Sequence, residues 1–469
     1  MKKSVSYLIL LVMMIVLLFS GCVSNSTGNT VENDANEAAS VEKTDEKPTE
    51  TIEEKVKLKY WALSRWKGIT GTEPDGQYGD WQRDVARRFM ENNPNVVDIE
   101  VEHIPASDIQ QKLTVAIASK TQPDVLEDND DRGTGFARMG ALVPVSDYFT
   151  KEEMDDFFEG SWDNGGIKMD GKYYMIPWSN SVQIMLINKT MFEKAGALHL
   201  LPNNEEKSWT YDQFKEALKA VTKDNVYGGC LFFGSTAGDA YAFNIIMGTG
   251  SRIVNEKGDK LIYNNSKTEL GLEFLISLID EKLVVPGAET LMYSDAKELF
   301  KQQKVATTFM GSSGFYEELY RDMDDGKIER FEIDYALFPH APGETPVLKG
   351  NYIGYLVFKS GNAQREKAAV ELAKFATNTE NSKALKIVKL IPLRKSVGNL
   401  YPGDEMTEWS TKIFKYAINH GYACPAYAQI RAAHVPMLQG LATKTTNIKD
   451  GLAEFESKIQ QEIEQALKQ

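Results

Sequence analysis

The segment EDNDDRGTG, residues 127–135, gathers five acidic or amide side chains, an arginine and two glycines. Carboxylates and a guanidinium can form paired hydrogen bonds with the hydroxyl or amine groups of a ligand. Asp128 and Asp131 could also act as the two carboxylates of a glycosidase. A calcium loop does not fit, because Gly133 follows Arg132 directly and no glutamate stands at the closing position. A solvated turn is the alternative that needs no ligand.

The remaining sequence offers few groups for catalysis or metal binding. It has no G-x-S-x-G, G-x-x-x-x-G-K-[ST] or G-x-G-x-x-G segment. Its five histidines lack the short spacings that place several ligands around one metal. Cys230 and Cys424 could form one disulfide, although two buried free thiols are expected. The sequence therefore predicts no metal and no cofactor.

The N-terminus has the parts of a secretory signal: two early lysines, an apolar run from Leu8 to Phe19, and Ser-Gly before Cys22. The apolar run is shorter than the about 20 residues that span a bilayer, which favours a signal over a single-pass anchor. The segment also resembles the lipobox of bacterial lipoproteins, whose cysteine is diacylated, although Phe19 replaces the usual leucine. We expect residues 1–21 to be removed and Cys22 to carry the lipid, which includes palmitate.

Residues 22–55 contain no aromatic side chain and no apolar periodicity, and they are rich in Ser, Thr, Asn and Glu. Such a segment cannot bury enough apolar area to offset the entropy of ordering. We expect a disordered acidic tether.

The composition is that of a soluble globular protein: 42% of the 469 residues are hydrophobic and 26% charged. A chain of this length exceeds one compact core, so two lobes are expected. The net charge of −14 argues against nucleic acid or an anionic lipid surface as partner, and it weakly favours a neutral or cationic ligand.

Strand and helix patterns alternate from Val56 onwards. They predict strands in 56–63, 95–105 and 123–127 and helices in 78–94 and 107–120, the second helix with Ser107 as N-cap. A loop is expected to follow the third strand, because the glycines there permit a sharp turn. This alternation predicts a mainly parallel sheet flanked by helices, with ligands beyond the carboxyl ends of its strands.

The order of several longer segments is that of a known family. QKLTVAIASKTQPDV, DGKYYMIPW, INKTMFEKAGA, SWTYDQFKEAL and GNYIGYLVFKSGNAQREKAAVELAKFA follow one another, and PMLQGLATKTTNIKDGLAEFESKIQQEIEQAL ends the chain. This succession resembles the extracellular solute-binding proteins of ABC importers, in the sugar-binding group that includes maltose-binding protein. No single motif is specific, but the resemblance covers essentially the whole mature chain.

The resemblance implies an α/β fold of the type II-like periplasmic-binding-protein kind, with mixed sheets flanked by helices and a ligand cleft between two lobes. The chain would cross between the lobes near Ile176-Pro177, near Tyr352 to Phe358 and near residues 395–405. The N-terminal lobe would comprise residues 56–177 plus 352–400. The C-terminal lobe would comprise residues 178–351 plus 401–469.

The resemblance also implies where ligand is held. The loop after the first strand offers Ser64, Arg65 and Trp66, although Trp66 could instead pack beneath it. Asp131 and Arg132 match an Asp-Arg pair that binds sugar hydroxyls in the family, whereas Asp128 replaces an aromatic contact.

Further candidates lie along the rest of the chain, in places where a cleft or the core could enclose them. Phe243 and Ile245 are expected in the core, whereas Trp178 could serve as hinge packing or as a cleft floor. Core packing competes with ligand contact for Phe315, Tyr422 and Tyr427. The full set of these later candidates is Trp178, Asp239, Tyr241, Asn244, Ser312, Phe315, Tyr316, Tyr422 and Tyr427.

The resemblance predicts a monomeric receptor that binds an oligosaccharide or related sugar and delivers it to an ABC permease. The predicted lipid would hold it on the outer face of the cell membrane of a bacterium without an outer membrane, which indicates a Gram-positive one. The same fold binding a peptide, polyamine or other small solute is the alternative. A secreted glycosidase is favoured less, so no enzymatic activity is predicted.

Overall fold

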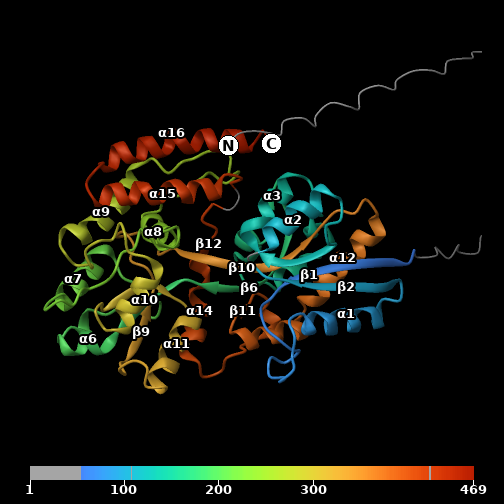
Figure 1. Cartoon of the computed structure of the whole chain (residues 1–469), viewed down its shortest axis with the longest axis horizontal. Coiled ribbons are helices and arrows are strands. Elements are labelled where there is room, and N and C mark those ends of the chain that lie inside the picture. The colour runs from blue at the N-terminus through green and yellow to red at the C-terminus, as the bar shows by residue number, and fades with distance from the viewer. Residues whose placement is uncertain (1–53, 107, 422–423, 469) are drawn as a thin grey trace, which may run out of the picture. The chain divides into compact units, whose positions relative to one another are not determined.

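Two β-sheets form the framework of this computed structural model, which describes residues 54–106, 108–421 and 424–468 (Figure 1). The seven-stranded sheet has the order β11-β6-β10-β3-β1-β2, with β12 paired to β10, and the three-stranded sheet has the order β8-β7-β9. The predicted signal, Cys22 and Tyr422 lie outside the described residues, as do the tether up to residue 53 and the side chain of Asp131.

The strands of the large sheet are β1 (Val56–Leu63), β2 (Val96–Ile104), β3 (Val125–Asn129), β6 (Met175–Val182), β10 (Leu348–Val357), β11 (Ile391–Pro392) and β12 (Ala417–Ile418). Those of the small sheet are β7 (Ile184–Asn188), β8 (Thr307–Gly311) and β9 (Ile333–Ala336), and β4 (Lys168–Met169) pairs with β5 (Lys172–Tyr173).

The helices are α1 (Asp80–Asn92), α2 (Ile109–Ala118), α3 (Asp130–Arg138), α4 (Lys151–Asp155), α5 (Ser161–Gly165), α6 (Lys189–Lys194), α7 (Tyr211–Val221), α8 (Ala237–Met247), α9 (Ser266–Asp280), α10 (Tyr293–Lys301), α11 (Ser313–Asp324), α12 (Ala363–Ala376), α13 (Thr379–Ser382), α14 (Glu405–Ile413), α15 (Tyr427–Ala442) and α16 (Ile448–Ala466). Short 3₁₀ turns lie at Val145–Tyr148, Leu198–Leu200, Lys383–Val388, Lys395–Val397 and Phe414–Tyr416.

The first half of the predicted strand and helix order is confirmed. β1 runs parallel to both β2 and β3, and α1 ends at Asn92 as the Asn-Asn-Pro signal indicated. The predicted N-cap of the second helix is wrong: Asp108 holds that position in α2, and Ser107 is outside the described residues.

The acidic segment after β3 is a helix and not the expected loop. β3 continues to Asn129, and α3 begins at Asp130. Arg132 Nε donates to Asp128 Oδ2 over 2.7 Å, so the arginine pairs with a carboxylate four residues earlier. Gly133 serves close packing and not a turn, since an added Cβ would come within 2.2 Å of Ile167.

β10 runs through the middle of the framework and pairs with three other strands. It is antiparallel to β3 and β6 and parallel to β12. Opposite Ile353 and Gly354, β6 carries one extra residue, Trp178, which makes a β-bulge. Gln183 alone separates β6 from β7 of the small sheet, so the chain passes between the sheets there.

The two faces of β10 contact different helices. Tyr352 packs against α5, where a Cβ on Gly165 would lie 2.4 Å from its ring. Tyr355 lies on the opposite face, because side chains alternate along a strand. Its ring lies 5.6 Å from that of Trp178, which stacks on Trp81 of α1. The face that carries Tyr355 is therefore the one that α1 covers.

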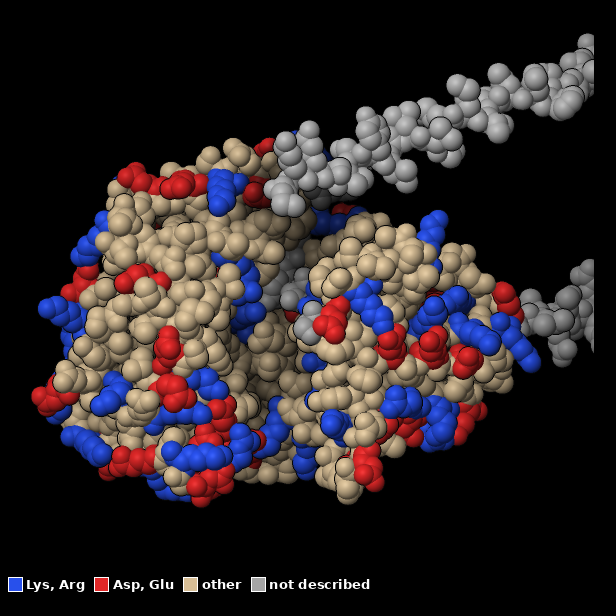
Figure 2. Space-filling model, in the orientation of Figure 1, with Lys and Arg blue, Asp and Glu red and all other residues tan. Residues whose placement is uncertain are grey.

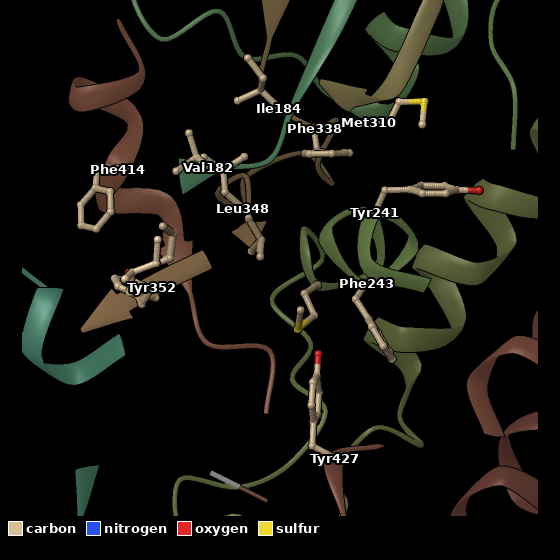
Figure 3. Packing of buried hydrophobic residues seen from close by; sticks show 14 of the residues in the cluster. Val182, Ile184, Tyr241, Phe243, Met310, Phe338, Leu348, Tyr352, Phe414 and Tyr427 are labelled. Atoms are coloured by element: carbon tan, nitrogen blue, oxygen red, sulfur yellow. The ribbon is translucent and has the colours of Figure 1, made fainter. Parts of the chain in front are cut away.

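Buried aromatic and aliphatic side chains pack around both sheets (Figure 3). Val182 of β6, Leu348 of β10 and Phe243 of α8 belong to one buried cluster. Phe243 and Ile245 are fully buried, as predicted. Cys230 and Cys424 are buried free thiols, which confirms that expectation.

Candidate functional site

Four polar side chains lie on one face of the paired strands β6 and β10. Ser181 pairs with Asn351, and Gln183 N donates to the carbonyl oxygen of Lys349 over 3.4 Å. Asn351 is exposed and the other three side chains are half-buried. We name Ser181, Gln183, Lys349 and Asn351 the polar strip.

The polar strip lies on a surface that a solute can reach. Figure 2 shows this face of the molecule hollowed along its middle, where Figure 1 places β6 and β10. The other face of β10 is closed, because Tyr352 is fully buried and its ring leaves no room for a side chain on Gly350. Only the polar face is thus available for binding.

A chain of hydrogen bonds stands at the carboxyl ends of β1 and β3, and we name it the arginine network. Arg65 donates through Nε to Glu127 Oε1 and through Nη2 to Asn129 Oδ1 over 3.2 Å. Gln82 Nε2 donates to the other oxygen of Glu127 over 3.0 Å. Glu127 is fully buried, whereas the Arg65 side chain is 15% exposed.

The arginine network leaves donor groups unused. Among the described residues, the Nη1 group of Arg65 has no hydrogen-bond partner, while its other nitrogens hold the guanidinium plane in place. Asn129 pairs with Ile353 on β10, four residues from Lys349. At the rise of a β-strand, the network is therefore about 13 Å from Lys349 along β10.

A second group of polar residues, the α8 cluster, lies at the other end of the polar strip. It consists of Asp239 and Asn244 of α8, Arg431 of α15, and His420. Arg431 donates to Asp239 through Nε over 3.0 Å and through Nη2 over 2.8 Å. Asn244 Nδ2 donates to Gln183 Oε1 over 3.1 Å, which joins the cluster to the polar strip.

Burial and charge set the protonation of this cluster. Asp239 is fully buried, and burial raises the pKa of its carboxyl in spite of Arg431. The ring of His420 is also buried, and its pKa lies well below the usual value because of burial and the charges of Lys349, Arg431 and Arg252. Within the described residues, neither ring nitrogen of His420 has a hydrogen-bond partner.

Several aromatic candidates lie inside the packed core. Trp178 is 1% exposed and donates through Nε1 to Ser382 Oγ over 3.0 Å. Trp66 lies against Trp81 with ring centroids 5.4 Å apart. Tyr241 is fully buried, and its hydroxyl accepts from Phe232 N over 2.8 Å. A role for Trp66, Trp178 and Tyr241 in binding stays a prediction.

The candidates on α11 form a separate group. Ser312 is the N-cap of α11, and its hydroxyl accepts from Phe315 N over 3.2 Å. Phe315 is buried, whereas Tyr316 is half-buried with its ring 4.9 Å from that of Tyr320.

The other candidates are close in sequence to one of the two polar groups. Ser64 and Arg65 lie beyond β1, and Arg132 lies in α3. Tyr427 opens α15 and precedes Arg431 by one helical turn, so both side chains share a helix face. The ligand contacts of all these residues stay predictions.

Sequence reasoning missed most of the residues that connect these groups, namely Gln82, Glu127, Asn129, Ser181, Gln183, Lys349, Asn351, His420 and Arg431. A signal for two of them was present, because Lys349 and Asn351 are polar at alternate positions of an otherwise apolar strand. The others become visible only when distant segments meet.

Other features of the described residues do not point to a different site. Cavities of about 620 Å³ near Trp162 and about 400 Å³ near Trp61 contain no predicted ligand residue. In the part of the chain that the structure describes, no cluster of His, Cys, Asp or Glu could hold a metal. No helix of that part is long and apolar enough to cross a membrane.

Known proteins share both sequence and fold with this chain. A family model described as "Bacterial extracellular solute-binding protein" matches residues 73–383. A putative binding protein of Brucella abortus is 28% identical over 243 residues, which cover 50% of this chain and 56% of the relative. The diacetylchitobiose binding protein DasA of Streptomyces coelicolor is 29% identical over 197 residues, 42% of each chain. The chain thus spans about half the length of these curated relatives.

Solved structures support the fold. The sugar-binding protein MalE of Xanthomonas citri superposes with a TM-score of 0.70 at 15% identity, covering 87% of this chain and 98% of that one. The likeness confirms the expected two-lobed α/β fold.

Proposed function

Because the chain belongs to the bacterial extracellular solute-binding proteins, we propose that it binds an oligosaccharide or related sugar and delivers it to an ABC permease. The observation that carries this proposal is the polar strip, a hydrophilic face on two central strands with a hydrogen-bonding group at each end. The names of DasA and MalE, which refer to diacetylchitobiose and to sugar, agree with it.

The strip suits a polyhydroxylated solute because it offers both donors and acceptors. Amides at positions 183 and 351 and the hydroxyl of Ser181 can each donate and accept. Arg65 presents its Nη1 group with little freedom of movement, since Glu127 and Asn129 hold the rest of its guanidinium. Such preorganised donors lower the entropic cost of binding.

Binding without chemistry is part of the proposal. A glycosidase would need two carboxylates on opposite sides of a scissile bond. Asp128 is bound through both of its oxygens to Arg132, which keeps it from acting as a free base. Absence of product release from model glycosides is therefore expected, and release that Asp131→Asn abolishes would contradict it.

Titration of the purified chain with a panel of sugars tests the proposal. A bound sugar is expected to raise the melting temperature and to change tryptophan emission, and saturation at 100 times Kd would stabilise the fold by about 2.7 kcal/mol. Arg65→Ala should weaken binding at least about 10-fold, because it removes a charged donor. Arg87→Ala, on the exposed face of α1, is the matched control. Unchanged melting with every sugar would contradict the proposal.

We extend the proposal to a lipid anchor at Cys22, with the permease as a membrane partner and the chain as a monomer on the outer face of the cell membrane. A tether would hold the receptor near its permease. Mass spectrometry of the native N-terminus should find a diacylated Cys22, and Cys22→Ser should release the protein into the medium. An unmodified cysteine, or retention of residues 8–19, would contradict this.

A further inference from the structure

Polar groups recur at regular intervals along the face that carries the polar strip. Ser179, Ser181 and Gln183 are two residues apart on β6 and its continuation, so their side chains share one face. Their partners on β10, in the same order, are Ile353, Asn351 and Lys349. Successive levels of this face are about 6.6 Å apart. The face therefore offers hydrogen-bonding groups at three levels.

Polar atoms without a partner gather at the two ends of this face. At the arginine network, Arg65 Nη1 and the buried Ser179 Oγ have no hydrogen-bond partner within the described residues. At the α8 cluster, the same holds for Gln183 Nε2, for the buried Asn244 Oδ1 and for both ring nitrogens of His420. Buried polar groups in folded proteins are nearly always hydrogen-bonded. Both ends can therefore gain hydrogen bonds from a bound molecule.

The two ends are too far apart for one sugar ring. Gln183 stands at the level of Lys349. Arg65 bonds Asn129, which pairs with Ile353 four residues further along β10. The ends are thus about 13 Å apart along the strand. A single pyranose ring is too short to contact both ends, whereas two or three linked rings can reach from one to the other.

Packed aromatic rings close the face at each end. Trp178 precedes Ser179 on β6, and its ring lies 6.4 Å from that of Trp66. At the α8 end, the ring of Phe243 lies 6.0 Å from that of His420. All four of these rings are buried. A longer sugar chain could therefore not continue along the strip past either end.

We propose that the solute is a sugar of two or three linked rings that spans the polar strip. Arg65 binds one terminal ring, and Gln183 binds the other. Ser181 and Asn351 contact the middle of the solute. This inference rests on the proposed function and narrows its substrate class to disaccharides and trisaccharides.

The experiment is calorimetry on the purified full chain with sugars of increasing length. One series contains glucose, maltose, maltotriose and maltoheptaose, and the other contains N-acetylglucosamine, diacetylchitobiose and triacetylchitotriose. Arg65→Ala removes a donor at one end, and Gln183→Ala removes an amide at the other. Arg87→Ala, at an exposed arginine, and Gln110→Ala, at an exposed glutamine of α2, are the matched controls.

In at least one series, affinity should rise at least about 10-fold from one ring to two or three rings, with one molecule bound per chain. Maltoheptaose should gain less than about threefold over maltotriose, since no further hydrogen bond is added. Arg65→Ala should weaken binding of the longer sugar at least about 10-fold and Gln183→Ala about three- to tenfold, whereas each control should change it less than about twofold. A monosaccharide contacts one end, so only one of the two variants should weaken its binding.

Other outcomes separate this inference from the proposed function. A monosaccharide that binds as tightly as its own dimer and trimer overturns the length inference and leaves the sugar receptor standing. A gain above about threefold from maltotriose to maltoheptaose does the same, as does unchanged affinity of the longer sugar in Gln183→Ala. If neither series binds, the comparison is made between the panel sugar that does bind and its monosaccharides. Absence of binding for every sugar contradicts the proposed function and this inference with it.

Discussion

The arginine network and the α8 cluster each set one arginine against a fully buried carboxylate, but they satisfy that carboxylate differently. Glu127 accepts from Arg65 and from Gln82, so a second side chain supports it. Asp239 depends chiefly on Arg431, which approaches from a helix 192 residues away in sequence. The first group is supported by α1 and by the carboxyl ends of β1 and β3, whereas the second joins α8 and α15.

This difference separates two tasks. A braced, charge-compensated arginine can offer donors to neutral hydroxyl groups at little electrostatic cost. A buried carboxylate with one main cation makes the fold depend on that cation.

The largest expected effect is that of Arg431→Ala. It leaves Asp239 buried without its cation, and unfolding free energy should fall by about 3–5 kcal/mol in urea denaturation. Adding Asp239→Asn should recover at least half of the loss, because the uncompensated charge is then gone. A loss no larger than that of Arg87→Ala, an exposed arginine, would contradict the role assigned to this pair.

Arg65→Ala should cost less, about 2–3 kcal/mol, because Gln82 still donates to the buried Glu127. The same urea titrations measure it. A loss of unfolding free energy equal to that of Arg431→Ala would contradict the proposed difference between the arginine network and the α8 cluster. Combining Arg65→Ala with Gln82→Leu should bring the loss up to the Arg431→Ala value.

His434 sharpens the comparison through pH, because it stacks on Phe243 of α8 and burial lowers its pKa to about 3. A histidine kept neutral when folded gives its full stability above its unfolded pKa and loses it as pH falls below that value. The free energy of unfolding should therefore fall by about 2 kcal/mol between pH 6.5 and 5.0 because of His434, at about 1.4 kcal/mol per pH unit.

His434→Gln keeps an acceptor for the Tyr263 hydroxyl and should remove that part of the pH dependence. The measurement is unfolding free energy at several pH values. His199→Gln, at an exposed histidine, is the control and should leave the pH dependence unchanged. Equal slopes in the parent and His434→Gln would show that His434 is not held neutral.

Asn244→Leu should have the smallest effect on stability, within about 1 kcal/mol of the parent. The Oδ1 atom of Asn244 is buried without a partner among the described residues, and half-buried Gln183 can turn to water. Solute affinity should nevertheless fall, since the amide that joins α8 to the polar strip is lost. Thermal melting and calorimetry check both parts, and a loss above about 3 kcal/mol would contradict the assignment.

The sequence was sufficient for those elements whose pattern is local. β1 and α1 could be predicted because alternation and an Asn-Asn-Pro stop are visible within a few residues. The acidic segment was misread as a loop because its composition is typical of turns.

The candidate site could be predicted only in part. Arg65, Asp239 and Asn244 were among the predicted ligand residues, but their partners Glu127, Arg431 and Gln183 were not. No local pattern links Asp239 to Arg431, because their contact depends on how α8 and α15 pack. A polar residue such as Lys349 in an apolar strand is also hard to interpret from sequence, because the strand pairing decides which face of the strand reaches solvent.

The alternation of side chains along β10 bears on how the proposed solute specificity can change during evolution. Lys349 and Asn351 lie on the polar face of β10, while Gly350 and Tyr352 lie on the opposite face and leave no room for a larger side chain. A substitution at position 349 or 351 can change the preferred solute without disturbing the fold. Inserting or deleting a single residue would shift the register of the strand by one and move Tyr352 to the polar face. New specificities along this strand should therefore arise by substitution and not by changes of length.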